Sequence, residues 1–319
     1  MKKNISIVIM ASSIFFGAAL ASNTYPNPKP KKTSGLDIAY LTKLAENGNA
    51  EAQTDLGVAY GNGNGVTQNH IKALYWYNKA AMRGYAPAQF NLGLFYENGW
   101  GTSKNIEQAI KWYTKAAEQD MTRAQVNLGT MYLENPHLEN SYSNAKKWLF
   151  EAAKKNDTNA MNNLGQMYVK GLGVKKNNTQ AEEWFTKAVA LGSMSAKNSL
   201  GAFYGSGLGQ NPEDINKVLA LVEGSACQGY VPAQINLGSF YAENDGEAPV
   251  DYKKAYAWYY VAYINGSVSS KNELSSLIRK MSSEELIEAK AKAIEYSQKY
   301  LSPPIQNDTY KSENECKYP

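Results

Sequence analysis

Histidine and cysteine are scarce in this sequence. Its 319 residues include two of each, with no C-x-x-C, H-E-x-x-H or H-x-x-x-H spacing. Ligands in the arrangement typical of structural zinc are therefore missing, and we expect neither a metal nor another cofactor. The sequence also has no large excess of one charge. It contains 33 basic and 29 acidic residues, and no basic run exceeds two residues. This balance argues against nucleic acid as a partner.

Long apolar runs are missing except at the N-terminus. Lys2 and Lys3 precede a largely apolar segment, residues 5–20, and a small-x-small cleavage pattern ends at Ala21. The apolar segment is shorter than the roughly 20 residues that span a bilayer. Ser22 stands where a lipoprotein would need Cys. We predict a signal peptide cleaved after Ala21, and a mature chain without a membrane span in the periplasm or outside the cell.

A repeat occupies most of the remaining sequence. Leu-Gly recurs six times at intervals of 36 or 37 residues, with Ala four positions before each Leu and Tyr four positions after it. The pairs are Leu56-Gly57, Leu92-Gly93, Leu128-Gly129, Leu164-Gly165, Leu200-Gly201 and Leu237-Gly238. This spacing places Ala, Leu and Tyr on one face of a helix.

A second apolar pattern predicts a second helix in each repeat. Ala-x-x-Trp begins at Ala73, Ala109, Ala145, Ala181 and Ala255. Gly-x-Gly pairs separate the two helices at 63–65, 99–101, 171–173 and 207–209, where a turn favours glycine because of positive φ. The glycine inside each first helix lowers helix propensity, which predicts close approach of a neighbouring helix.

These motifs together resemble the Sel-like repeat family, a relative of the tetratricopeptide repeats. The resemblance covers about residues 36–267 and is most complete in 52–84 and 88–117, which read A-Q-x-x-L-G-x-x-Y followed by A-x-x-W-Y-x-K-A-A. It implies an all-α fold, an α-solenoid in which antiparallel helix pairs stack into a right-handed superhelix. Stacking is also required physically, because one pair cannot bury its own Leu, Tyr and Trp.

The resemblance sets the expected domain organisation. A Pro-rich linker, 22–35, precedes a solenoid over 36–301, and a polar tail, 302–319, follows it. We place six repeats and the capping helices at about 50–85, 86–121, 122–157, 158–194, 195–230, 231–267 and 268–301. Ser282 and Glu285 predict a capping box in the last helix.

Two repeats depart from the family pattern. Residues 133–144 lack Gly-x-Gly, and Leu221-Val222 replaces the Trp-Tyr pair. Five of the six Trp residues, all but Trp100, occupy one repeat column. We interpret that column as core and not as a ligand site.

Catalytic residues are not evident. No Ser-His-Asp arrangement or recurring carboxylate column occurs in the predicted first helices. The resemblance implies a protein-interaction scaffold and no enzyme. A cysteine-rich bacterial branch of the family has been linked to β-lactam binding and hydrolysis, but that branch carries a Cys pair in every repeat, and this chain does not.

The binding face is predicted by helical position. Relative to Ala52, the positions equivalent to 54, 55 and 58 lie away from the Leu and Tyr face. They resemble the concave lining of tetratricopeptide-type solenoids, in which Asn holds a peptide backbone. The predicted partner-binding residues are Asp55, Phe90, Asn91, Leu94, Val126, Asn127, Thr130, Asn162, Asn163, Gln166 and Asn236. Packing of a first helix on both of its neighbours would instead bury part of this set.

The sequence thus favours an exported adaptor that binds a peptide or protein segment, and the resemblance implies a bacterial protein that acts in envelope processes or host interaction. The alternative is a peptidoglycan- or carbohydrate-associated factor, with or without β-lactamase-like activity. We also predict a Cys227–Cys316 disulfide, because export leads to an oxidising compartment and the mature chain keeps an even number of cysteines. Two unrelated thiols are the alternative.

Overall fold

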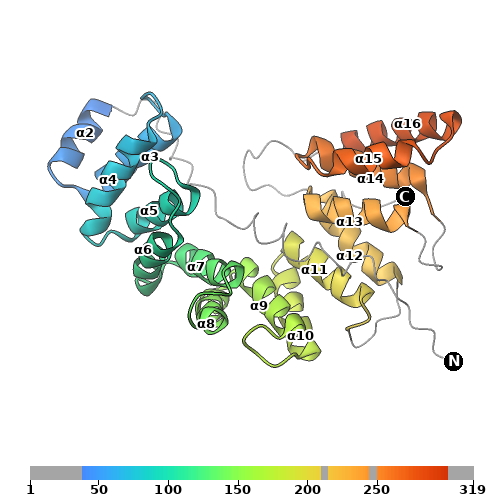
Figure 1. Cartoon of the computed structure of the whole chain (residues 1–319), viewed down its shortest axis with the longest axis horizontal. Helices are drawn as coiled ribbons and strands as arrows, with labels where there is room; N and C mark the ends of the chain where they lie inside the picture. Colours follow the sequence, from blue (N-terminus) through green and yellow to red (C-terminus); the bar gives the residue numbers. More distant parts are fainter. Residues whose placement is uncertain (1–37, 210–214, 244–249, 301–319) are drawn as a thin grey trace. The chain divides into compact units, whose positions relative to one another are not determined.

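The computed structural model describes residues 38–209, 215–243 and 250–300. These residues form helices and contain no strand, and consecutive helices pair as the repeats predicted. The chain is an α-solenoid (Figure 1). It divides into two compact units, whose described parts are residues 38–163 and 164–300. The division falls inside α9 (Thr158–Lys170).

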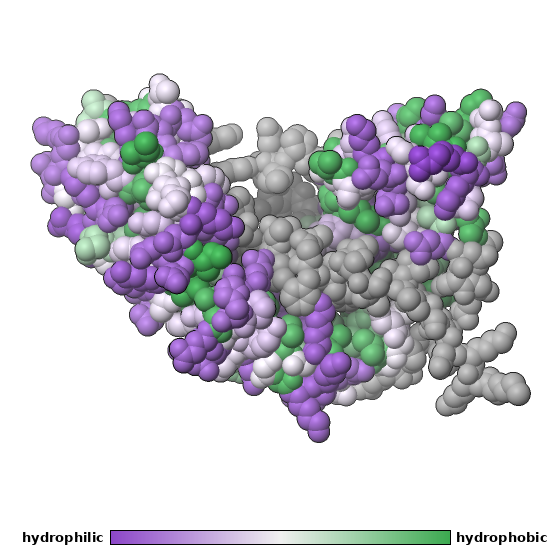
Figure 2. Space-filling model, viewed as in Figure 1, coloured by the Kyte–Doolittle hydropathy of each residue, from purple (hydrophilic) through white to green (hydrophobic). Residues whose placement is uncertain are grey.

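The described part of the N-terminal unit contains one leading helix, three helix pairs and the start of α9. The leading helix is α2 (Ile38–Glu46). The pairs are α3 (Ala50–Asn62) with α4 (His70–Met82), α5 (Ala86–Asn98) with α6 (Ile106–Glu118), and α7 (Thr122–Glu134) with α8 (Ser141–Ala153). Each helix packs on the next one, from α2 to α8. The visible surface of this unit is mainly hydrophilic, with small separate apolar patches (Figure 2).

The C-terminal unit also consists of consecutive helices, and its described part ends at α16. Its helices after α9 are α10 (Asn178–Ala190), α11 (Met194–Gly205), α12 (Ile215–Cys227), α13 (Val231–Ala242), α14 (Tyr252–Ile264), α15 (Ser270–Ile278) and α16 (Ser283–Tyr300). The last helix packs mainly on α14. It begins at the predicted capping box, in which Ser282 N donates to Glu285 Oε2 at 2.9 Å and Glu285 N donates to Ser282 Oγ at 3.2 Å.

Glycine in the first helices permits close packing within each pair. A Cβ added at Gly93 would lie 2.6 Å from the ring of Tyr113, which is closer than a real Cβ contact. Tyr113 is fully buried. In the fifth repeat Val222 replaces the aromatic ring, and it stands equally close to Gly201. The predicted close approach of a neighbouring helix is therefore confirmed. Leu221-Val222 differs from the family's Trp-Tyr pair, yet α11 and α12 still pack closely at Gly201.

The turn between paired helices uses a recurring backbone bond. The amide of Asn69 donates to Tyr60 O, and that of Asn105 donates to Tyr96 O, both at 2.8 Å. The third repeat lacks Gly-x-Gly, and there the hydroxyl of Ser141 donates to the Tyr132 carbonyl. A side chain thus replaces the missing backbone donor.

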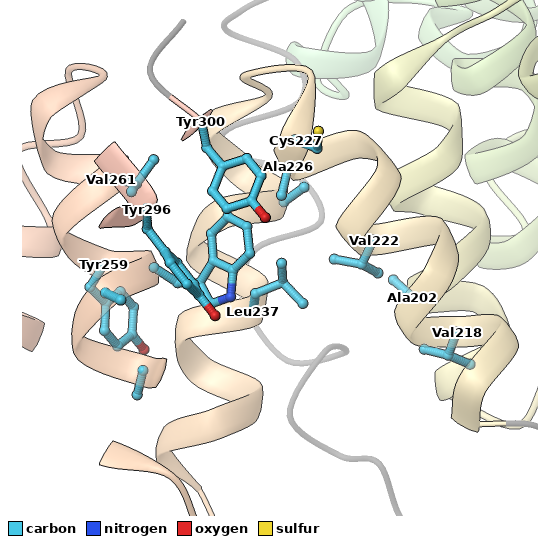
Figure 3. Close-up of a cluster of buried hydrophobic side chains, with 14 of the residues drawn as sticks. Ala202, Val218, Val222, Ala226, Cys227, Leu237, Tyr259, Val261, Tyr296 and Tyr300 are labelled. Atoms are coloured by element: carbon cyan, nitrogen blue, oxygen red, sulfur yellow. The ribbon is translucent and has the colours of Figure 1, made fainter. Parts of the chain in front are cut away.

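An aromatic cluster closes the C-terminal unit. Trp258 stacks on Tyr300 with ring centroids 5.0 Å apart and meets Tyr296 edge-on at 5.1 Å. Figure 3 shows Tyr296 and Tyr300 together, with Leu237 of α13 nearby. The predicted core role of the Trp column holds for Trp76, Trp112, Trp148 and Trp258, which are buried, while Trp184 is half-buried.

Candidate functional site

The residues predicted to line a binding face differ sharply in exposure. Asp55 is exposed. The other ten are buried, namely Phe90, Asn91, Leu94, Val126, Asn127, Thr130, Asn162, Asn163, Gln166 and Asn236. Neighbouring first helices approach closely enough for Asn163 Nδ2 to donate to Thr130 Oγ1 at 3.2 Å. The alternative interpretation, packing of a first helix on both neighbours, therefore accounts for most of the set.

The apolar members of the set belong to the core. Phe90 and Leu94 lie in one buried cluster with Tyr113 and Trp148, and Phe90 is 1 % exposed. Val126 has no exposed surface. The expected apolar pocket among Phe90, Leu94 and Val126 is not open, because helix packing fills it.

One polar member of the set keeps an unused acceptor. The Tyr113 hydroxyl donates its only proton to Glu97 Oε2 at 2.5 Å, so toward Asn127 it can only accept. Asn127 Nδ2 donates to it at 3.4 Å, which fixes the orientation of the amide. The remaining atom, Asn127 Oδ1, is buried and has no hydrogen-bond partner among the described residues.

Two further asparagines in this unit have unsatisfied buried atoms. Asn91 is the equivalent of Asn127 one repeat earlier, and its Oδ1 also lacks a partner within the described chain. Asn162 Nδ2 and Oδ1 are also buried without a hydrogen-bond partner among the described residues. Buried polar atoms without partners are uncommon in folded proteins, so these positions are candidates for contact with a ligand.

In the C-terminal unit, the equivalents of Asn127 and Thr130, which are Asn236 and Ser239, both have partners within the unit. Asn236 Nδ2 donates to Asn198 Oδ1 at 2.9 Å. Ser239 Oγ and Tyr259 Oη are 2.9 Å apart and share a hydrogen bond. Burial raises the pKa of Tyr259 to about 12. These groups serve packing within the unit.

Two carboxylates are linked to the Asn127 network, Glu97 by the hydrogen bond from Tyr113 and Glu134 by the effect of the Glu97 charge on its pKa. Burial raises the pKa of Glu97, while the hydrogen bond from Tyr113 and the charge of Lys104 oppose the shift. Glu134 is exposed as a residue, but partial burial of its carboxylate raises its pKa, and the charge of Glu97 raises it further while that of Lys104 lowers it. The pKa of Tyr113 lies well above its usual range because of its burial and then the nearby Glu97 charge.

The structure also assigns a role to a glutamine that sequence reasoning did not explain. Gln53, Gln89, Gln125 and Gln234 each donate through Nε2 to the carbonyl near the end of the preceding second helix, at 2.9 to 3.2 Å. The recurring Gln of the A-Q-x-x-L-G motif marked this position in the sequence. The fourth and fifth repeats carry Met161 and Lys197 at this position.

Several sequence predictions concern residues outside the described ranges. The signal peptide 1–21, the linker 22–35 and the tail 302–319 lie there, as does Cys316. Cys227 is buried at the end of α12. Within the described ranges, no group of three or more His, Cys, Asp or Glu could hold a metal ion. No described helix is long and apolar enough to cross a membrane.

A known repeat family matches five segments of this chain. The Sel1 repeat profile matches residues 50–85, 86–121, 122–157, 158–193 and 231–267. The chain belongs to the Sel1 repeat family. Family members are generally interaction scaffolds without enzymatic activity, and protein partners are thus expected for this Sel1 repeat protein. The profile passes over residues 194–230, which contain the Leu221-Val222 departure.

Solved structures of relatives agree with this assignment. A Sel1 repeat protein from Oxalobacter formigenes is 33% identical, with a TM-score of 0.64, over 70% of this chain and 90% of its own. A protective antigen present in uropathogenic Escherichia coli strains, which displays an SLR fold, is 31% identical with a TM-score of 0.52. That match covers 83% of this chain but only 49% of the antigen. No protein of curated function matches.

Proposed function

We propose that the protein is an exported bacterial adaptor that binds an extended protein segment along the first helices of its N-terminal unit. The observation that carries this proposal is the unpaired Asn127 Oδ1, held in place by the Tyr113 hydroxyl. A backbone N–H of an incoming segment would satisfy this acceptor. Asn91 Oδ1 offers the same group one repeat earlier. Repeated amides suit main-chain recognition, because a polypeptide presents donors at regular intervals.

Neighbouring helices cover most of the predicted partner-binding residues. The part of the site that solvent can reach therefore lies near the helix ends. Asn98, Arg123 and Glu134 are exposed on α5 and α7. Buried Phe90, Leu94 and Val126 serve as the packed base and not as contacts. The proposed contacts are therefore polar, and they depend on side-chain hydrogen bonds more than on apolar burial.

Export rests on the N-terminal sequence. The basic pair, the apolar segment and the Ala21 site together have the pattern of a signal peptide. The resemblance to a protective antigen fits an envelope or host-directed role. N-terminal sequencing of the chain recovered from the producing bacterium should begin at Ser22. A chain that retains Met1 would overturn export.

Peptide binding is tested by selection and by paired variants. A library of random linear peptides is selected on the purified chain, and the affinities of the recovered peptides are measured by calorimetry. Asn127→Ala should weaken binding about tenfold, the effect expected from losing one well-formed hydrogen bond in a site. Asn236→Ala is the matched control, because it removes the same residue type from the same column in the C-terminal unit, where the amide is paired.

The possible results separate the candidates. Equal loss in both variants would contradict a site in the N-terminal unit. Failure to select any peptide, combined with co-sedimentation of the chain with isolated peptidoglycan, would favour the cell-wall alternative.

A further inference from the structure

Two acidic residues stand at helix ends where acids are disfavoured. Glu97 is in the last turn of α5, and Glu134 is the last residue of α7. The C-terminal end of a helix carries partial negative charge, so cations stabilise it and carboxylates do not. Neither helix has a basic residue in its last turn. The two carboxylates therefore do not serve the stability of their own helices.

The charge of the first carboxylate reaches the second. The negative charge of Glu97 raises the pKa of Glu134. Lys104 is near enough to lower the pKa of both, yet among the described ion pairs none joins it to either carboxylate. A cation in direct contact with both carboxylates would relieve their repulsion further than Lys104 does.

A buried amide oxygen belongs to the same group of acceptors. Asn127 is 4 % exposed, and its Oδ1 has no partner among the described residues. It connects to Glu97 through the Tyr113 hydroxyl, which donates to the carboxylate and accepts from the Asn127 amide nitrogen. The unpaired buried atom of this group is an acceptor, and the carboxylate oxygens of Glu97 and Glu134 are acceptors too. A ligand that fits it must bring several donors and positive charge.

We infer that Glu97, Glu134 and Asn127 form a site for a basic side chain, preferably arginine, of the bound segment. The guanidinium group carries five N–H donors in a planar fork and matches carboxylate geometry. The inference rests on the proposed function, because it names the side chain that the peptide-binding site selects. It makes the adaptor selective for basic segments and not merely for an extended backbone.

The test uses the peptides selected on the wild-type chain. Arginine should be enriched among them. Each arginine peptide is compared with its citrulline counterpart, which has nearly the same shape and no charge. Citrulline should weaken binding to the wild-type chain about tenfold, the effect of losing one charge-assisted contact.

The variant Glu97→Gln/Glu134→Gln should bind both peptides equally, at the level of wild type with citrulline. Its control is Glu118→Gln/Glu139→Gln, which removes the same charge from exposed positions of the N-terminal unit and should keep the preference for arginine. Thermal unfolding of the glutamine variant should occur no lower than in wild type, so weakened binding cannot come from misfolding.

The two proposals fail in different ways. Selected peptides without basic residues, or equal binding of arginine and citrulline peptides by the wild type, would refute the basic-side-chain site and leave peptide binding intact. A preference that survives in Glu97→Gln/Glu134→Gln would likewise refute the site. Absence of any selected peptide would refute the proposed function itself.

Discussion

The two units use the same repeat but treat its polar column differently. In the N-terminal unit, Asn91 and Asn127 keep buried oxygens without partners among the described residues. In the C-terminal unit, Asn236 is bonded to Asn198, and Ser239 is bonded to Tyr259. A polar position in a repeat protein can therefore be hydrogen-bonded within the fold in one part of the array and keep an atom without such a partner in another. The repeat motif alone does not distinguish these uses.

The largest expected effect on stability comes from the aromatic cluster of Trp258, Tyr296 and Tyr300. Trp258 is 1 % exposed and contacts both tyrosines of α16. Trp258→Ala should lower the free energy of unfolding of the C-terminal unit by about 3–5 kcal/mol through loss of packing and a cavity. Urea unfolding followed by far-ultraviolet circular dichroism measures this. A loss as small as that of a surface substitution would show that the cluster does not close the unit.

Loss of the predicted Cys227–Cys316 disulfide should give the next largest decrease in the free energy of unfolding. Cys227→Ser should cost about 2–5 kcal/mol if the bridge forms, since a cross-link over a long loop restricts the unfolded chain. Peptide mapping without reductant should recover the two cysteines in one cross-linked peptide pair. Recovery of both as alkylated thiols would contradict the prediction, and the effect of Cys227→Ser would then reflect packing alone.

Removing equivalent asparagines sharpens the comparison of the units. Asn236→Ala breaks a hydrogen bond and leaves Asn198 without that partner, so it should destabilise by about 1–3 kcal/mol. Asn91→Ala removes an unsatisfied oxygen and should cost less than Asn236→Ala. Equilibrium unfolding of both variants under one set of conditions provides the check. The reverse order would indicate that the Asn91 amide contributes to the fold.

The smallest effect concerns the pH dependence of stability. Because burial raises the pKa of Glu97, the folded chain binds its proton more tightly than the unfolded chain does. The resulting loss of stability is absent below the unfolded pKa of Glu, about 4.3, and complete above the raised folded pKa. Glu97→Gln keeps an acceptor for Tyr113 and removes the ionisation.

Glu97→Gln should therefore be more stable than wild type at neutral pH, by less than about 1 kcal/mol. The advantage should disappear when the pH falls below the ordinary pKa of Glu. Chemical unfolding at a series of pH values tests this. A variant that is less stable at neutral pH would show that the ionised carboxylate supports the fold.

Sequence periodicity was sufficient for the fold but not for the site. The spacing of Leu-Gly and Trp predicted the paired helices, and Ser282 with Glu285 predicted the final helix start. Helical position alone could not decide the exposure of Phe90 or Val126, because a first helix contacts helices on more than one side. The Asn127 network was beyond prediction, since it requires Glu97, Tyr113 and Asn127 to meet from three helices.

The glutamine bonds carry a consequence for how the array loses structure. Gln53, Gln89, Gln125 and Gln234 each fasten a first helix to the end of the helix before it, so neighbouring repeats share the cost of opening. Met161 interrupts this series at the junction of the third and fourth repeats, because its side chain has no N–H or O–H to donate. Stability of a linear array is a sum of terms between neighbours, and that junction lacks one of these terms. Amide hydrogen exchange should therefore be faster there than at the junctions that Gln89 and Gln125 fasten.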